Sequence, residues 1–364
     1  MNYIISIKTA ILVFPFIALI FSIPFILHQY HKYGSINPFR VLIVYSFVLY
    51  MITVYFLVIL PLPNRNDVIA KPNMIRLIPF GFVNDFIKES SLVLTDFGTY
   101  LKAIMEPCFY TVAFNILMTI PLGMYLRYYF KCDFKKTFMI SLCLSLFFEI
   151  TQLTGLYGFY SHPYRVFDVD DLIMNTLGGI IGYLIMGFLE KFLPSRDVID
   201  QESKEAGAVV SGFRRITVFV LDCFLYAFIT LLLRIIIRNN SLAFIVFIIY
   251  FIVYPYLKNG ETIGSKFLNV RLEFHKKRLI KITLRAFFLF AYYFGSVMII
   301  IMLSLFATQR LNLKFIEASG LYIMVMIGIL LFYLINIFAL FKDKKLYYDN
   351  IFKVKYISTI NKSK

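Results

Sequence analysis

The sequence has few of the residues on which soluble domains and cysteine-based sites depend. It contains no Trp, four Cys and 16% charged side chains in 364 residues. An ordinary soluble domain has about 25% charged residues. The four cysteines show no paired spacing, so we expect neither a disulfide framework nor a thiolate metal site. The low charge excludes an ordinary soluble domain.

Catalytic motifs are also missing. No nucleophile motif, phosphate-binding glycine loop or zinc-binding helix occurs. We therefore predict no metal and no cofactor, and the sequence leaves open whether the protein is an enzyme. Acidic residues are scarce beside basic ones, 21 against 37, which gives a formal net charge of +16. Because most of this excess lies in short connections between apolar runs, nucleic acid is not the expected partner.

Long apolar runs dominate the chain. Hydrophobic residues make up 60% of it, and the mean hydropathy is +0.77. Runs of about 20 residues with almost no charge predict helices that span a membrane. The expected fold class is all-α, a polytopic transmembrane helical bundle with about nine spans in two units. The predicted spans are 4–27, 40–61, 108–129, 137–154, 170–190, 215–237, 241–257, 284–306 and 320–341.

The basic residues of the connections predict an orientation. One alternate set of connections holds 26 of the 37 Lys and Arg. The richer set should face the cytoplasm. This places the N-terminus and the loops 62–107 and 155–169 outside, and the C-terminus in the cytoplasm. A single miscounted span would reverse the assignment of everything before it.

A shift in composition divides the chain into two transmembrane parts. Residues 191–213 are polar and of mixed charge, which indicates a cytoplasmic linker. The predicted organisation is an N-terminal helix with its connection at 1–39, a first transmembrane domain at 40–190, the linker, a second transmembrane domain at 214–352 and a basic cytoplasmic tail at 353–364.

Three spans carry polar side chains where lipid would make them costly. Glu149 lies within an apolar run, and Gln152 follows on the same helical face. A carboxylate near the bilayer centre costs about 2.5–3.5 kcal/mol, so Glu149 should face the interior of the bundle. Asn115 and Asn175 place amides in two other spans at a similar depth. The three spans predict a polar layer about 8–10 Å below the outer surface.

The loop before the fifth span should cover this layer with charged side chains. Arg165 and Asp168 precede the helix, and Asp171 lies in its first turn, where a carboxylate suits the free amides. Helix capping, a structural clamp around Glu149 and a site for a polar headgroup would all use these groups. A metal site that also includes His162 is a further alternative, but the ligand spacing for it is lacking. The predicted outer pocket comprises Asn115, Glu149, Gln152, Arg165, Asp168, Asp171 and Asn175.

Small residues predict close helix packing beneath this pocket. Gly178 and Gly182 form a small-xxx-small seam, and Gly179 lies beside it. In the third span, Pro121 removes a backbone hydrogen bond and should bend the helix, with Gly123 two residues later. We expect all five residues to serve packing.

Taken in order, these elements resemble the VanZ family. The matching elements are Leu77-Ile78-Pro79-Phe80, Asn115-xxxxx-Pro121-x-Gly123, Glu149-xx-Gln152 and Arg165-xx-Asp168-x-Asp170-Asp171-xxx-Asn175-xx-Gly178-Gly179-xx-Gly182. The resemblance covers about residues 40–190. It implies a multi-pass protein of the bacterial cell membrane, whose namesake is associated with low-level resistance to the glycopeptide teicoplanin. Arg76 departs from the pattern, since the family has Asn at this position.

The resemblance and the pocket together suggest a first hypothesis. The protein would engage membrane lipids, or a lipid-linked cell-wall precursor, at the outer face. Glu149 would be the acceptor or proton carrier, Arg165 would bind a phosphate or carboxylate, and Asp168 would orient Arg165. A rival hypothesis is a membrane enzyme that alters a lipid headgroup, with Glu149 as general acid or base.

The second transmembrane domain resembles the RDD family over about residues 210–352. The resemblance rests on Arg215, on Asp222 two helical turns later, on the loop 260–271 and on Arg285, with Asp349 as a weaker match. It implies an ion or proton antiporter as a third hypothesis, while a buried ion pair that only anchors the sixth span is the structural alternative. The predicted inner cluster comprises Arg215, Asp222, Glu261, Lys266, Arg285 and Asp349.

Overall fold

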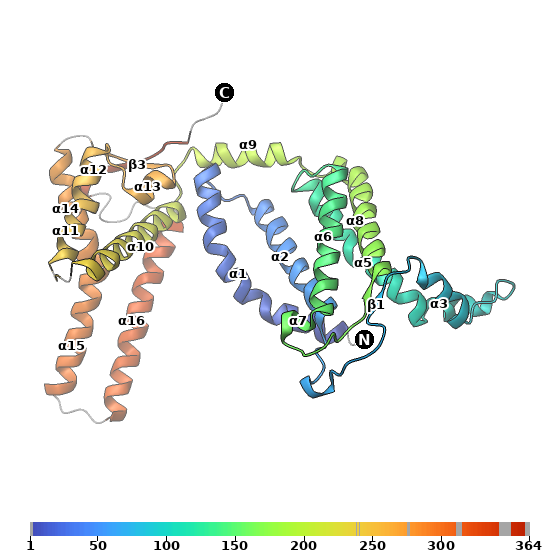
Figure 1. Cartoon of the computed structure of the whole chain (residues 1–364). Helices are drawn as coiled ribbons and strands as arrows, with labels where there is room; N and C mark the ends of the chain where they lie inside the picture. The colour runs from blue at the N-terminus through green and yellow to red at the C-terminus, as the bar shows by residue number, and fades with distance from the viewer. Residues whose placement is uncertain are drawn as a thin grey trace. The chain divides into compact units, whose positions relative to one another are not determined.

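The fold is that of an all-α polytopic membrane protein, as predicted. The computed structural model describes residues 3–237, 239, 241–274, 277–310, 315–341 and 351–360. In this part of the chain, eight helices are long and apolar enough to cross a membrane, and Leu242–Leu257 forms a shorter apolar helix. These elements correspond to the nine predicted spans, the seventh of which is the short one (Figure 1).

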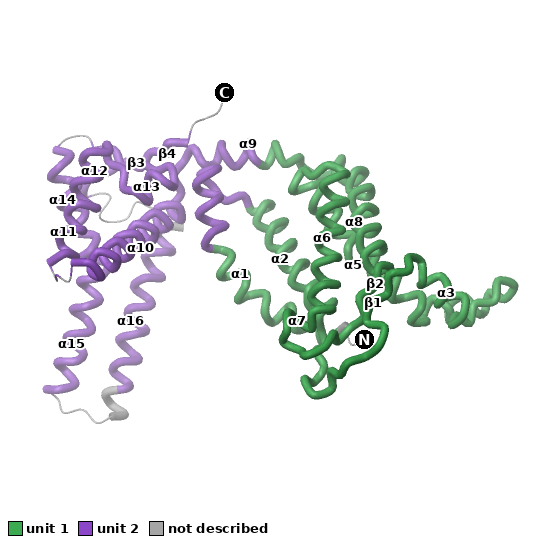
Figure 2. The backbone as a smooth tube through the Cα atoms, in the orientation of Figure 1, with its two compact units in different colours: residues 1–22, 38–199 green, residues 23–37, 200–364 purple. Residues whose placement is uncertain are grey.

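The chain forms two compact units (Figure 2). Unit 1 comprises Met1–Ser22 and Pro38–Ile199, and unit 2 comprises Ile23–Asn37 and Asp200–Lys364. The boundary after Ile199 falls within the stretch predicted as a linker. That stretch is not irregular, because its middle forms helix α9 (Arg196–Gly207).

Unit 1 is built from helices with short irregular connections. Its elements are the first part of α1 (Tyr3–Tyr33), α2 (Pro38–Ile59), η1 (Arg65–Asp67), β1 (Ile75–Arg76), α3 (Gly81–Glu89), η2 (Phe97–Thr99), α4 (Tyr100–Ile104), α5 (Pro107–Tyr128), α6 (Phe134–Leu153), α7 (Gly155–Gly158), β2 (Phe167–Asp168), α8 (Val169–Leu189), η3 (Glu190–Phe192) and the start of α9. Local chemistry fixes several starts. Pro107 opens α5, and the side chain of Asp133 caps α6 by accepting the N–H of Lys136 at 2.7 Å.

Helices α5 and α8 pack so closely that only glycine fits between them. A Cβ added at Gly182 would lie 1.9 Å from the carbonyl oxygen of Ile120, and one added at Gly123 would lie 1.8 Å from that of Gly179. Helix α6 also packs against α8, where Gly179 faces Ser141. The glycines therefore let three polar-bearing helices share one interior.

The two loops predicted to face outward meet at one end of unit 1. Strands β1 and β2 pair in parallel, with Ile75 opposite Phe167 and Arg76 opposite Asp168. Loops 62–107 and 155–169 therefore lie on the same side, as alternating spans require. At the other end of unit 1, Lys131 Nζ lies 2.6 Å from Asp197 Oδ1.

Unit 2 combines the second part of α1 with the rest of the chain. Its elements are the end of α9, α10 (Gly212–Ile236), α11 (Leu242–Ile248), η4 (Ile249–Val253), α12 (Tyr254–Leu257), α13 (Ile263–Phe267), β3 (Val270–Phe274), α14 (Arg278–Phe290), η5 (Ala291–Gly295), α15 (Ser296–Arg310), α16 (Phe315–Phe341) and β4 (Val354–Ser358). Strands β3 and β4 form an antiparallel pair. Strand β4 lies in the segment predicted as a basic tail, so Val354–Ser358 of this segment belong to the strand pair of unit 2.

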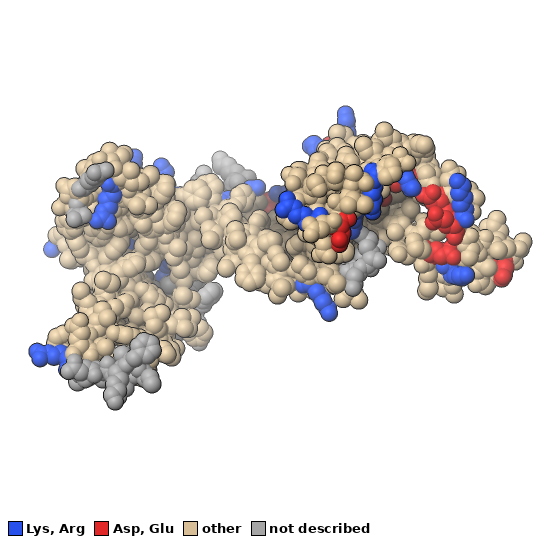
Figure 3. Space-filling model, turned by 60° about the horizontal axis from the view of Figure 1, so that its bottom comes forward, with Lys and Arg blue, Asp and Glu red and all other residues tan. Residues whose placement is uncertain are grey.

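The surface is largely apolar, as lipid-facing helices require. Leu12 in α1 and Met324 in α16 are 71% and 66% exposed. Charged side chains are sparse over most of the face shown in Figure 3, and the largest group of acidic side chains on that face lies on unit 1. A lipid environment would cover this apolar surface.

Candidate functional site

A cavity of about 560 Å³ lies within unit 1, among α2, α5, α6, α8 and the loop that precedes α8. All seven residues of the predicted outer pocket line it. They are Asn115, Glu149, Gln152, Arg165, Asp168, Asp171 and Asn175. The remaining wall is mainly apolar and includes Leu57, Phe114, Met118 and Phe148. We call this the outer cavity.

Glu149 lies in the last turn of α6 and is 3% exposed. Its Oε2 accepts the backbone N–H of Asp168 at 3.1 Å. No salt bridge to Glu149 occurs in the part of the chain that the structure describes. The carboxylate is therefore held by one backbone donor, and its second oxygen remains available to the cavity.

The two asparagines of the cavity fix their neighbours with their N–H groups. Asn115 Nδ2 donates to Asp171 Oδ1 at 2.5 Å, which joins α5 to α8. Asn175 Nδ2 donates to Ser145 Oγ at 3.0 Å, which joins α8 to α6. Asn175 is 4% exposed, and its Oδ1 accepts no hydrogen bond from any described residue. A buried acceptor without a donor is costly, so this oxygen is a candidate contact for a ligand.

Arg165 and Gln152 bind the end of α2. Arg165 donates to the carbonyls of Val58 at 2.7 Å and Leu60 at 3.1 Å, and Gln152 Nε2 donates to Val58 at 3.0 Å. The last carbonyls of a helix have no partner within the helix, so these bonds satisfy them. Whereas the sequence suggested that Arg165 binds a ligand anion, in the structure its two terminal nitrogens hold the loop to α2.

Asp168 connects the cavity to the paired strands. Its Oδ1 caps α8 by accepting the N–H of Asp170 at 2.9 Å, and its Oδ2 lies 3.4 Å from Arg76, which also pairs with Asp85 at 2.9 Å. Burial raises the pKa of Asp168, although the Asp170 N–H and Arg76 oppose the shift. The partner of Asp168 is thus Arg76 and not the predicted Arg165. An uncharged side chain at position 76 could not supply this charge.

Asp170 makes hydrogen bonds to the outer loop that the sequence did not indicate. It is 4% exposed and accepts the backbone N–H groups of Phe80 at 2.6 Å and Phe82 at 2.9 Å. Phe80 has φ 62°, and it leads directly into α3. Asp170 therefore anchors the outer loop to α8. Its position at the start of an apolar helix suggested only capping.

The structure does not assemble the metal site considered from the sequence. His162 is exposed and does not line the outer cavity. Within the described ranges, no group of three His, Cys, Asp or Glu is placed to hold a metal ion.

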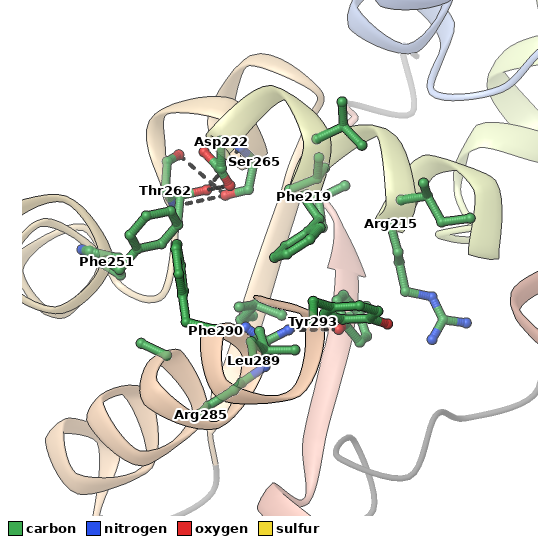
Figure 4. A pocket seen from close by; sticks show the side chains of 18 of the residues that line it. Arg215, Phe219, Asp222, Phe251, Thr262, Ser265, Arg285, Leu289, Phe290 and Tyr293 are labelled. Atoms are coloured by element: carbon green, nitrogen blue, oxygen red, sulfur yellow. Dashed lines mark hydrogen bonds between the residues drawn. The ribbon is translucent and has the colours of Figure 1, made fainter. Parts of the chain in front are cut away.

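Unit 2 contains a second cavity of about 260 Å³, which is mostly apolar (Figure 4). Of the five members of the predicted inner cluster that the structure describes, three line it, namely Arg215, Asp222 and Arg285. Glu261 pairs with Arg271 at 2.8 Å, and Lys266 is exposed. Asp349 lies outside the described residues.

Arg215 and Asp222 do not form the predicted pair. Asp222 accepts hydrogen bonds from Tyr250 at 2.7 Å, Thr262 at 2.5 Å and the Gly264 N–H at 2.8 Å. Arg215 points away from it in Figure 4 and lies 4.8 Å from the ring of Tyr356. Seven residues of helix separate the two positions by about 10 Å along the axis, and Arg215 is not among these three donors to Asp222.

Among the described arginines of unit 2, the buried one is Arg214, the neighbour of the predicted residue. It is 0% exposed and donates to the carbonyls of Gly207 at 2.9 Å, Leu268 at 2.9 Å and Asn269 at 2.7 Å, and to Ser358 Oγ. It therefore joins the ends of α9, α13 and β4. The Arg-Arg sequence alone gave no reason to prefer one of the two.

Comparison with known proteins supports the first of the two resemblances. Residues 47–190 match the family model described as VanZ/LLP1, and this range includes every residue that lines the outer cavity. The match does not include residues 210–352, so the RDD resemblance stays a prediction. Neither the curated proteins nor the solved structures gave a match.

Proposed function

We propose that unit 1 is a VanZ-type membrane domain that engages an envelope lipid or a lipid-linked wall precursor through the outer cavity, and thereby lowers susceptibility to teicoplanin. The observation that supports this most strongly is the cavity itself, in which polar side chains from three apolar helices and one loop converge. Polar groups placed in a membrane interior usually have a functional task, because their insertion is costly.

The positions of the polar residues suit a headgroup. Glu149 lies four residues from the end of α6, and Asn175 lies six residues from the start of α8, which corresponds to about 6–9 Å of helix. With loops 62–107 and 155–169 outside, this level lies just beneath the outer headgroups. A lipid could then keep its chains among the apolar helices while its polar end enters the cavity.

The proposed orientation has a direct test. In a variant without native cysteines, a single cysteine at Ser161 should react with an impermeant reagent added to intact cells, whereas one at Lys135 should react only after the membrane is opened. The reverse pattern would place the cavity on the cytoplasmic side and refute the proposal.

The proposed function is tested by teicoplanin susceptibility. Cells that express Glu149→Gln at wild-type membrane abundance should lose the protection that the wild-type protein gives, because the substitution replaces the cavity's most buried carboxyl group with an amide. Glu89→Gln is the matched control, since Glu89 is exposed on α3. Equal protection by Glu149→Gln and wild type would remove Glu149 from the mechanism.

The enzyme alternative uses the same carboxylate. One oxygen of Glu149 is fixed by the Asp168 N–H while the other faces the cavity, as a general acid or base requires. Overexpressing and deletion strains should then differ in one lipid headgroup species, and identical lipid extracts would exclude this alternative.

The antiporter alternative has less support. Three protein donors surround Asp222, which favours a structural task for it. Ion flux into vesicles that persists in Asp222→Asn would exclude the simplest antiporter.

A further inference from the structure

The outer cavity offers hydrogen-bond acceptors that the protein does not use. Glu149 and Asp171 each have one carboxylate oxygen engaged, by the Asp168 N–H and by Asn115. Within the described chain, their second oxygens accept no hydrogen bond. The buried Oδ1 of Asn175 is likewise without a donor. These three acceptors belong to residues of two helices that line the cavity.

The donor nitrogens of the same cavity each have a partner in the protein. Asn115 donates to Asp171, Asn175 donates to Ser145, and Gln152 donates to the end of α2. The terminal nitrogens of Arg165 donate to two backbone carbonyls. A ligand that brings only acceptors, such as a phosphate or a carboxylate, would leave the second oxygens of Glu149 and Asp171 without a donor.

The charged groups of the cavity also favour a ligand that carries positive charge. Three carboxylates line it, those of Glu149, Asp168 and Asp171, beside a single guanidinium. Arg76 compensates Asp168 at 3.4 Å but does not line the cavity. A positive ligand would offset the remaining negative charge in surroundings where apolar side chains reduce screening. The unsatisfied oxygen of Asn175 points to a ligand independently of the acidic groups, because Asn175 is neutral and only 4% of the residue is exposed.

We propose that the outer cavity binds a primary ammonium group, whose three N–H donors match the unpartnered oxygens of Glu149, Asp171 and Asn175. This inference rests on the proposed function and specifies the headgroup chemistry for it. The ammonium can belong to a lipid headgroup or to a free amine. A quaternary ammonium has the same charge but no N–H donor, so it separates hydrogen bonding from charge.

The test uses the purified full-length protein in detergent and short-chain phospholipids with identical acyl chains. Binding to ethanolamine, choline and glycerol headgroups is compared, together with free ethanolamine. We expect the ethanolamine phospholipid to bind about tenfold or more tightly than the choline phospholipid, since charge-assisted hydrogen bonds are lost. Glu149→Gln and Asn175→Leu should each reduce this preference, whereas Glu89→Gln should retain it. Thermal unfolding of each variant identifies any that fails to fold, and Asp171→Asn then replaces it.

The outcomes separate this inference from the proposed function. Equal binding of choline and ethanolamine headgroups, or a preference for the anionic glycerol headgroup, would overturn the ammonium assignment while lipid engagement stands. Free ethanolamine that binds as tightly as the phospholipid would support the ammonium assignment but identify a soluble amine as the ligand. Binding of none of the four probes would overturn the ammonium assignment and leave only a lipid-linked wall precursor as the ligand of the proposed function.

Discussion

The glycine seam between α5 and α8 yields a prediction that tests the packing and the site together. In Gly182→Ala, the added Cβ would lie 1.9 Å from the carbonyl oxygen of Ile120, whereas ordinary contact begins at 3.4 Å. The two helices would have to separate by about 1.5 Å, because the obstacle is backbone and not a flexible side chain. Overpacking of this kind costs about 1–3 kcal/mol.

The separation should also disturb the outer cavity. Helix α5 carries Asn115 and helix α8 carries Asp171, and their side chains meet at 2.5 Å across the seam. A displacement of about 1.5 Å would break this hydrogen bond, since such bonds weaken beyond about 3.2 Å. We therefore expect Gly182→Ala to lower both the unfolding temperature of the purified protein and the protection of cells against teicoplanin.

Thermal unfolding in detergent, followed by fluorescence, measures the first effect. The control is Gly328→Ala in α16, where an added Cβ meets nothing within 4 Å. This control should be neutral or more stable, because Ala favours helix over Gly by about 1 kcal/mol. A Gly182→Ala protein with wild-type unfolding temperature and full protection would refute the argument from close packing.

Three further substitutions test individual contacts. Arg165→Lys should cost about 1–3 kcal/mol and make loop 155–169 more sensitive to protease, since Lys cannot reach both carbonyls at the end of α2; unchanged digestion would argue against this anchor. Burial raises the pKa of Asp168 in the folded state. The contribution of Asp168 to the stability of the fold is therefore complete below the ordinary pKa of 3.8 and is lost as pH rises through the raised pKa. Asp168→Asn should therefore show a smaller fall in unfolding temperature between about pH 4 and pH 7 than wild type, and parallel pH curves would contradict the shift. Arg214→Lys should destabilise unit 2 by about 2 kcal/mol or more, because the backbone carbonyls that Arg214 binds would lose their donors, while Arg215→Lys should cost less. Equal losses in unfolding temperature would show that burial does not distinguish the two arginines.

Hydropathy and spacing predicted the membrane fold and the residues of the outer cavity. Apolar runs of helical length are local in sequence, so they identify spans without any tertiary information. Asn115, Glu149 and Asn175 could be assigned to one level because a polar group in such a run must face inward and helical rise converts position into depth. Gly178 and Gly182 predicted a seam for a similar reason, since small residues four positions apart share one face.

The partners of these side chains could not be predicted in this way. The sequence paired Arg165 with Asp168, but the pairing of β1 with β2 brings Arg76 to Asp168 instead. The RDD resemblance favoured Arg215, although Arg214 is the buried residue.

The physical reason is that adjacent residues on a helix point about 100° apart, so the sequence fixes their relative directions while only the packed neighbours decide which direction is interior. Hydrogen bonds to backbone carbonyls leave no pattern in side-chain spacing. For this reason the donor and acceptor balance of the outer cavity, on which the ammonium assignment depends, became visible only in the tertiary structure.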